Sequence, residues 1–139
     1  MPNLNAYLTF DGTCAEAMRF YENVLGGKMQ SMMTFGESPM AAETPPAQAN
    51  RIMHASLLVG DNALMASDSM PGHPYPGMHG FSLSLNYPTT AAARVVYEAL
   101  TSGGKVIMPL QKTFWAEGFA MLVDRFGVPW MINVDAPRA

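Results

Sequence analysis

Cysteine, charged residues and long apolar runs are all scarce in this sequence, and each shortage excludes a class of protein. Cys14 is the only cysteine in 139 residues, which excludes an internal disulfide and fits a reducing compartment. Charged residues make up 14% of the chain and its formal net charge is −3, so no basic face is available for nucleic acid. No apolar run approaches the roughly 18 residues that a membrane-spanning helix needs.

The start of the chain, MPNLNAYLTF, has no basic region ahead of its short apolar stretch, which is typical of a strand rather than a signal peptide. We therefore expect a cytoplasmic protein whose partner is a small molecule, not nucleic acid or a membrane. With 49% hydrophobic residues, the 139-residue chain has the size and composition of a single domain, residues 1–139. Cys14 falls at an expected helix start, and we interpret it as a small buried residue rather than a catalytic thiol.

Two segments of the chain resemble each other and predict matching helices. Residues 13–28 read TCAEAMRFYENVLGGK, and residues 89–105 read TTAAARVVYEALTSGGK. Thr13 with Glu16 has the pattern of a capping box, and the double glycine of each segment supplies left-handed residues that end helices. Both segments carry apolar residues at the spacing of one buried helical face, namely Ala17, Phe20, Tyr21, Val24 and Leu25, and Ala92, Val95, Val96, Ala99 and Leu100.

Strand-like runs flank the two predicted helices in the same order. Each half has one run before its helix, one after it, and a further pair joined by turn residues. The runs are 4–10, 29–35, 54–59 and 63–67 in the first half, and 80–85, 106–110, 119–123 and 128–134 in the second. The sequence therefore predicts an α+β fold of two tandem βαβββ modules, about 1–70 and about 78–139, which join in one curved mixed sheet with a concave cup.

Two stretches lack the period of a helix or a strand. Residues 36–49 are rich in Pro, Ala and Glu and predict a mobile loop, and residues 69–78, SMPGHPYPGM, predict the linker between the modules. Asp68 and Asp124 stand at strand ends, where aspartate usually accepts hydrogen bonds from backbone amides. We favour that structural role for both.

The phrases AYLTFDGTCAEAMRFYENVLGG, ALMASDSMPG and FAMLVDRFGVPWMIN resemble the PhnB-like branch of the vicinal oxygen chelate superfamily, the group of glyoxalase I, bleomycin-binding proteins and extradiol dioxygenases. The resemblance covers nearly the whole chain. It implies a fold of paired βαβββ modules, commonly a homodimer, with a ligand cup between modules.

The resemblance also implies where a metal would bind. Enzymes of the superfamily typically hold a divalent metal through His and Glu side chains from the first and last strand of each module. The corresponding positions in this sequence hold Ala6, Met65, Ser82 and Met131, the third with an uncertainty of a residue or two. None of these side chains is a good ligand for a divalent metal. We therefore expect no metal and no other cofactor, with a shifted site around His79 and Asp68 as the alternative.

Without a metal, the inward strand positions predict a mostly neutral pocket. Phe114 and Trp115 stand in an expected loop, where large aromatic side chains often close over a ligand, although packing in the core or in a dimer interface is equally consistent with the sequence. Trp130 is expected to face the helices. The predicted ligand-binding residues are Ala6, Met65, Ser82, Phe114, Trp115, Met131 and Asn133.

Two functions remain open at this point. The first is a metal-free, dimeric protein that binds a small, largely apolar molecule, because the chain has thirteen methionines and Met adapts to varied apolar ligands. The alternative is a metal-dependent lyase, isomerase or dioxygenase in which a shifted metal polarises a substrate oxygen. Which ligand or substrate is involved does not follow from the sequence.

Overall fold

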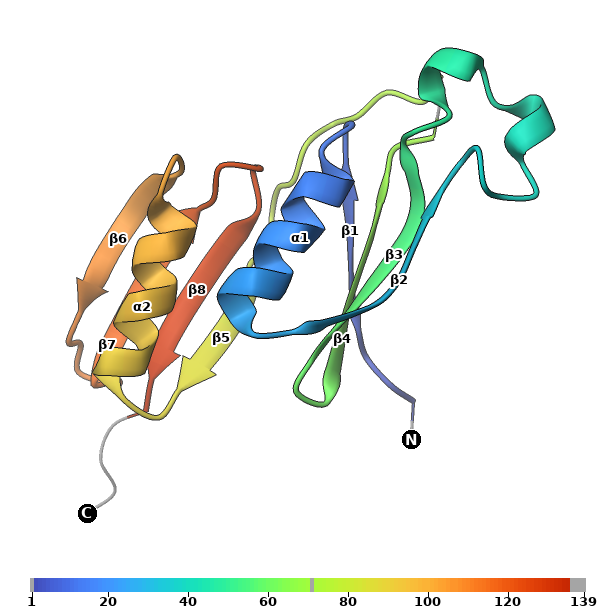
Figure 1. Cartoon of the computed structure of the whole chain (residues 1–139). Coiled ribbons are helices and arrows are strands. Elements are labelled where there is room, and N and C mark those ends of the chain that lie inside the picture. Colours follow the sequence, from blue (N-terminus) through green and yellow to red (C-terminus); the bar gives the residue numbers. More distant parts are fainter. Residues whose placement is uncertain (1, 71, 136–139) are drawn as a thin grey trace. The chain divides into compact units, whose positions relative to one another are not determined.

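The computed structural model describes residues 2–70 and 72–135 and divides the chain into two compact units, Met1–Gly77 and Met78–Ala139 (Figure 1). The first unit contains β1 (Ala6–Phe10), α1 (Cys14–Leu25), β2 (Lys28–Thr34), two 3-10 helices η1 (Ala41–Glu43) and η2 (Pro46–Gln48), β3 (Ile52–Val59) and β4 (Asn62–Asp68). The second contains β5 (Leu83–Tyr87), α2 (Thr90–Thr101), β6 (Lys105–Gln111), β7 (Gly118–Val123) and β8 (Pro129–Val134). The predicted pair of βαβββ modules is confirmed.

Each unit forms its own four-stranded mixed sheet, in the order β1-β4-β3-β2 in the first and β5-β8-β7-β6 in the second. The first and last strands of each module pair in parallel, and the other neighbours are antiparallel. One helix packs on one face of each sheet (Figure 1). We call the opposite face, which no helix of the same unit covers, the open face of that sheet. In the part of the chain that the structure describes, no helix is long and apolar enough to cross a membrane.

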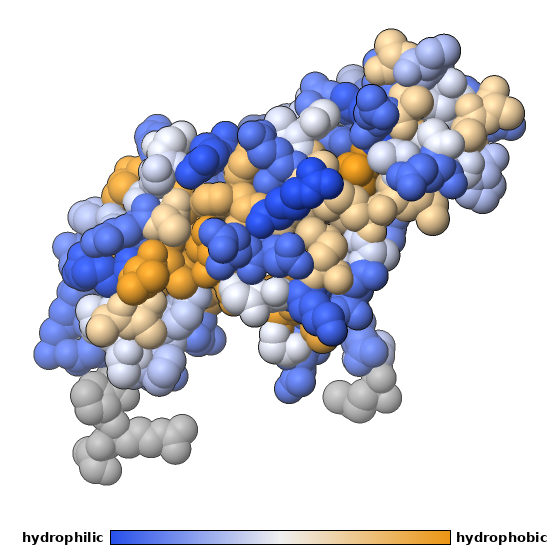
Figure 2. All heavy atoms as spheres, in the orientation of Figure 1, coloured by the Kyte–Doolittle hydropathy of each residue, from blue (hydrophilic) through white to orange (hydrophobic). Residues whose placement is uncertain are grey.

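The buried faces of the two helices differ in part from the sequence prediction. In α1, Ala17 and Tyr21 are fully buried as expected. In α2, the buried residues are Ala93, Val96 and Leu100, while Val95 is 70% exposed. The prediction that Val95 is buried is wrong because the run of alanines at the helix start fits two neighbouring helical faces equally well. Figure 2 shows the resulting apolar patch over α2.

The repeated double glycine has one physical cause in both modules. Gly26 has a φ of 68° and is the left-handed cap that ends α1, as predicted. The same prediction is wrong for α2, which ends at Thr101 with Ser102 as an extended cap, and Gly103 follows in the turn with a φ of 75°. At the second glycine the chain passes directly against the next strand. A Cβ on Gly27 would lie 2.8 Å from the carbonyl oxygen of Leu58, and one on Gly104 would clash with the backbone of Val123 and Asp124. The second position therefore excludes any side chain.

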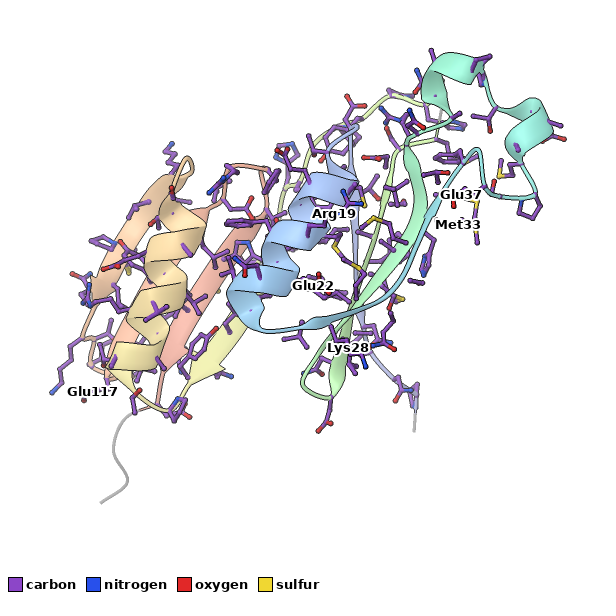
Figure 3. All side chains as sticks on the ribbon, in the orientation of Figure 1. Arg19, Glu22, Lys28, Met33, Glu37 and Glu117 are labelled. Atoms are coloured by element: carbon purple, nitrogen blue, oxygen red, sulfur yellow. The ribbon has the colours of Figure 1, made fainter. Side chains whose placement is uncertain are left out.

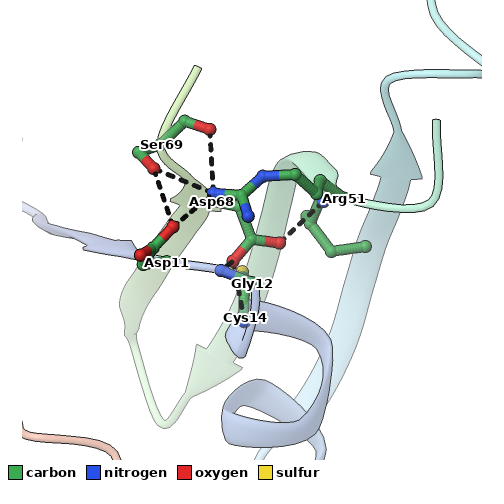
Figure 4. Close-up of polar contacts among 7 residues, drawn as sticks. Asp11, Gly12, Cys14, Arg51, Asp68 and Ser69 are labelled. Carbon is green, nitrogen blue, oxygen red and sulfur yellow. Dashed lines mark hydrogen bonds and ion pairs between the residues drawn. The ribbon is translucent and has the colours of Figure 1, made fainter. Parts of the chain in front are cut away.

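The start of α1 is held by a residue from the other end of its module. The predicted capping box is wrong, because the side chain of Thr13 makes no capping hydrogen bond. Instead the carboxylate of Asp68, at the end of β4, accepts hydrogen bonds from the amides of Gly12 at 2.7 Å and Cys14 at 3.0 Å (Figure 4). Its second oxygen accepts the amide of Ile52 at 2.8 Å. Asp68 thus has the structural role favoured by the sequence, and it joins the end of β4 to the starts of α1 and β3.

We expect Asp68→Asn to lower the free energy of unfolding by about 2 kcal/mol, because one acceptor oxygen is replaced by a donor facing a backbone N–H. Urea denaturation measures the change. Asp61→Asn, at an exposed hairpin position, is the matched control and should change stability little. Equal stability of the two variants would contradict the structural role assigned to Asp68.

Candidate functional site

The pairing register decides which side chains share a face of the first sheet. Ala6 is paired with Leu64, which is buried under α1, whereas Tyr7 is paired with Met65. The prediction that Ala6 lies on the same face as Met65 is therefore wrong by one residue. The error arises because the turn between the first strand and the helix has a length that the sequence does not specify. Tyr7 occupies the open-face position that had been assigned to Ala6.

The open face of the first sheet is mainly polar. The hydroxyl of Tyr7 lies 3.2 Å from Nδ1 of His54, although β1 and β3 are separated by β4. The two side chains therefore reach across the intervening strand, with ring centroids 5.7 Å apart. Met33 is paired with His54 and extends this face onto β2, as Figure 3 indicates. Hydroxyl groups surround the Tyr7–His54 contact, and the pairing register places Thr9, Ser31, Ser56 and Ser67 on the same face.

The open face of the second sheet carries a row of methionines. Met108 of β6 is paired with Met121 of β7, and Met121 is paired with Met131 of β8. Ser84 of β5, paired with Met131, ends the row. We call these four residues the methionine row. All three methionines are half-buried, so their thioethers remain partly accessible.

Aromatic side chains border the methionine row. Phe119 is paired with Asn133 and shares its face, and the ring of Trp115 packs edge-on against Phe119 with centroids 5.3 Å apart. Trp115 is 50% exposed, and it also contacts the ring of Phe114, which is 96% exposed. The structure therefore brings the predicted residues Met131, Asn133 and Trp115 together, and leaves Phe114 directed outward.

Two of the predicted residues lie elsewhere, and one prediction about a tryptophan is confirmed. Ser82 precedes β5, and Ser84 is the serine beside Met131. Met65 belongs to the first sheet. Trp130 is 2% exposed and pairs with Leu83 on the helix-covered side, where its Nε1 donates to Asp124 at 2.9 Å. The role of the exposed positions in ligand binding stays a prediction.

The residues at the expected metal positions do not fit a divalent metal. By register these positions are Tyr7, Met65, Ser84 and Met131, which offer no imidazole and no carboxylate. Among residues 2–70 and 72–135, no group of three or more His, Cys, Asp or Glu side chains is placed to hold a metal ion. The carboxylate of Asp68 accepts three backbone amides, and His79 belongs to the other unit.

Known proteins resemble this chain along nearly its whole length. The family model described as the Glyoxalase/Bleomycin resistance protein/Dioxygenase superfamily matches residues 3–132. Protein YjdN of Escherichia coli strain K12 is 34% identical, with 94% of each chain covered. The crystal structure of protein PA1353 from Pseudomonas aeruginosa is 47% identical with a TM-score of 0.90, covering 97% of this chain and 98% of that one. The PhnB protein from Bacillus cereus, 24% identical, has the same fold with a TM-score of 0.81 over 96% and 99% of the chains.

Cys14 is unsuited to nucleophilic chemistry. Its side chain is fully buried at the start of α1. Burial, and secondarily the negative charge of Asp68, raises the pKa of the thiol to about 12. Because the reactive form of cysteine is the thiolate, the folded protein holds this residue in its inert form at neutral pH.

We expect native protein at pH 8 to react negligibly with 5,5′-dithiobis(2-nitrobenzoate), and one thiol to react at once in concentrated urea. The raised pKa also makes the free energy of unfolding depend on pH, because the thiol ionises at a lower pH in the unfolded chain than in the folded protein. Stability should be unaffected by this group below about pH 9 and should fall as pH rises from there toward 12. The Cys14→Ser variant, in which this loss should vanish, is the control. Rapid modification of the native protein would contradict the assignment.

Proposed function

This chain belongs to the Glyoxalase/Bleomycin resistance protein/Dioxygenase superfamily, and on that premise we propose that it is a metal-free homodimer that binds a small, largely apolar molecule. Its resemblance to the PhnB-like branch, predicted from the sequence, is confirmed. A shared fold hosts both binding proteins and unrelated chemistries, so the proposal depends on the residues of the open faces.

The methionine row is the observation that supports this proposal most directly. Three half-buried thioether side chains lie side by side across β6, β7 and β8, and Trp115 stands next to them. Methionine has three rotatable bonds and a polarisable sulfur, so such a surface adapts its shape to an apolar ligand. The edge of Trp115 adds an aromatic surface, and Asn133 supplies a polar group that can orient the ligand.

The chemistry of the expected metal positions supports binding over metal-assisted catalysis. Thioether sulfurs and hydroxyl oxygens carry no charge to balance a divalent cation. They stand at the positions where enzymes of the superfamily typically have His and Glu ligands. The homodimer is expected from the resemblance to the superfamily. No residue cluster in the described ranges favours the alternative lyase, isomerase or dioxygenase.

A fluorescent probe with an apolar aromatic ring system tests the proposed surface. We expect 1-anilinonaphthalene-8-sulfonate to bind the folded protein saturably, and Met131→Gln to weaken its affinity about tenfold, because an amide at the centre of the methionine row must lose its hydration. Met40→Gln, a half-buried methionine beside η1, is the matched control and should bind like the wild type. Equal affinity of all three proteins would place the probe elsewhere and overturn the assignment of this face.

Metal analysis and native mass spectrometry test the remaining parts of the proposal. We expect protein purified without chelators to contain far less than one divalent metal per chain and to show a native mass of twice 15.1 kDa. A retained small molecule released on denaturation would identify the ligand. A stoichiometric metal that is lost in His79→Ala would instead establish the shifted metal site, and a monomeric mass would reject the homodimer.

A further inference from the structure

A second candidate site lies within the first unit, beyond the ends of β1 and β4 and the start of β3. It is a cavity of about 370 Å³, bounded by the turn after β1, by the segment from η2 to the start of β3, and by residues that follow β4. Its size is within the range of small-molecule pockets. Its polar lining comes from Asp11, Gln48, Arg51, Ser69 and His73. None of these residues belongs to a strand.

Arg51 is held rigidly at the wall of this cavity. Its Nη2 donates to Oδ1 of Asp11 at 3.0 Å, to Oγ of Ser69 at 2.8 Å and to the carbonyl of Ser69 at 3.2 Å (Figure 4). Its backbone amide donates to the carbonyl of Gln48 at 3.1 Å, and its carbonyl accepts the amide of Phe35 at 2.9 Å. The side chain is 19% exposed. A cation fixed in this way loses little further entropy when a ligand binds.

Hydrogen-bonding capacity remains unused at this cluster. Nε of Arg51 is buried and has no hydrogen-bond partner. Within the described residues, the hydrogen bonds of the guanidinium all leave from Nη2, although Arg has five N–H donors. The side chain of Asp11 is 60% exposed, and its hydrogen bonds to the described residues involve Oδ1. Because Nε is fully buried, it cannot reach a ligand in the cavity, and only the terminal nitrogens of Arg51 can supply donors to one.

The positions of these charges define the ligand. The guanidinium of Arg51 and the carboxylate of Asp11 are in contact, so a ligand that meets both must carry an anionic and a cationic group within a few ångström. An amine and a carboxylate on the same carbon satisfy this condition. Met70 and Pro45 add apolar surface to the same cavity.

We propose that this cavity binds a free α-amino acid with an apolar side chain, its carboxylate on Arg51 and its ammonium on Asp11. The site is independent of the proposed function of the open faces. Failure of either proposal leaves the other standing.

Amide chemical shifts of ¹⁵N-labelled full-length protein test the site with three matched probes. L-leucine carries both charged groups, 4-methylpentanoate lacks the amine, and 3-methylbutylamine lacks the carboxylate. We expect saturable shifts from L-leucine at the amides of Gly12, Arg51, Ser69 and His73, with each of the other probes binding about tenfold or more weakly. Shifts at the methionine row alone would overturn the cavity and favour the open face. Equal affinity for L-leucine and 4-methylpentanoate would reduce the site to an anion site and overturn the amino-acid assignment, and no saturable shift would overturn both.

A charge-removing variant of Asp11 tests the proposed contact between its carboxylate and the ammonium group of the ligand. Asp11→Asn should lower the affinity for L-leucine to that for 4-methylpentanoate, and should not weaken binding of 4-methylpentanoate. Glu43→Gln, an exposed carboxylate on η1 outside the cavity lining, is the control and should keep the wild-type preference. Unchanged discrimination in a folded Asp11→Asn protein would overturn the proposal. The comparison of three probes on the wild type decides the matter alone if that variant does not fold.

Discussion

The first module depends on a single buried carboxylate. Asp68 is 2% exposed and stands at the end of the central strand β4, where its two oxygens bind the amides that begin α1 and β3. Its two neighbours in sequence have different surroundings, because one belongs to β4 and the other follows the end of that strand. Ser67 lies on the open face, and Ser69 binds Arg51 at the cavity. Asp68 thus joins the ends of three elements of the unit, next in sequence to a residue of the open face and a residue of the cavity.

The second module has the same register without this interaction. Leu64 of β4 pairs with the first residue of β1, and Trp130 of β8 pairs with the first residue of β5. Four positions further along, β4 has Asp68 and β8 has Val134. The helix α2 begins instead with a local cap, in which the side chain of Thr89 accepts a hydrogen bond from the amide of Ala92 at 3.2 Å. A different carboxylate, Asp124, closes the β7–β8 turn by accepting the amides of Phe126 and Val128. Duplication preserved the backbone pattern while the polar interactions that stabilise it diverged.

Much of the fold could be predicted because the two halves of the sequence resemble each other, and each supports the interpretation of the other. The site was harder to predict, since one residue of register exchanges the two faces of a strand, as happened with Ala6 and Tyr7. Met131 and Asn133 were placed together correctly because they lie on one strand, where alternation suffices. The cavity was missed entirely. Asp11, Arg51 and Ser69 are far apart in the sequence and stand in turns, where no periodicity relates them.

The corresponding rows of the two open faces show what divergence changed. The positions of Ser31, Ser56, Met65 and Tyr7 in the first sheet match those of Met108, Met121, Met131 and Ser84 in the second. The first row has three hydroxyls and one thioether, and the second has three thioethers and one hydroxyl, so the two rows differ in polarity on the same backbone pattern. A divalent cation requires charged or imidazole ligands at several of these positions at once, and neither row supplies one. Under the proposed function, recognition by these rows rests on packing and neutral hydrogen bonds, which depend on shape and apolar area more than on charge.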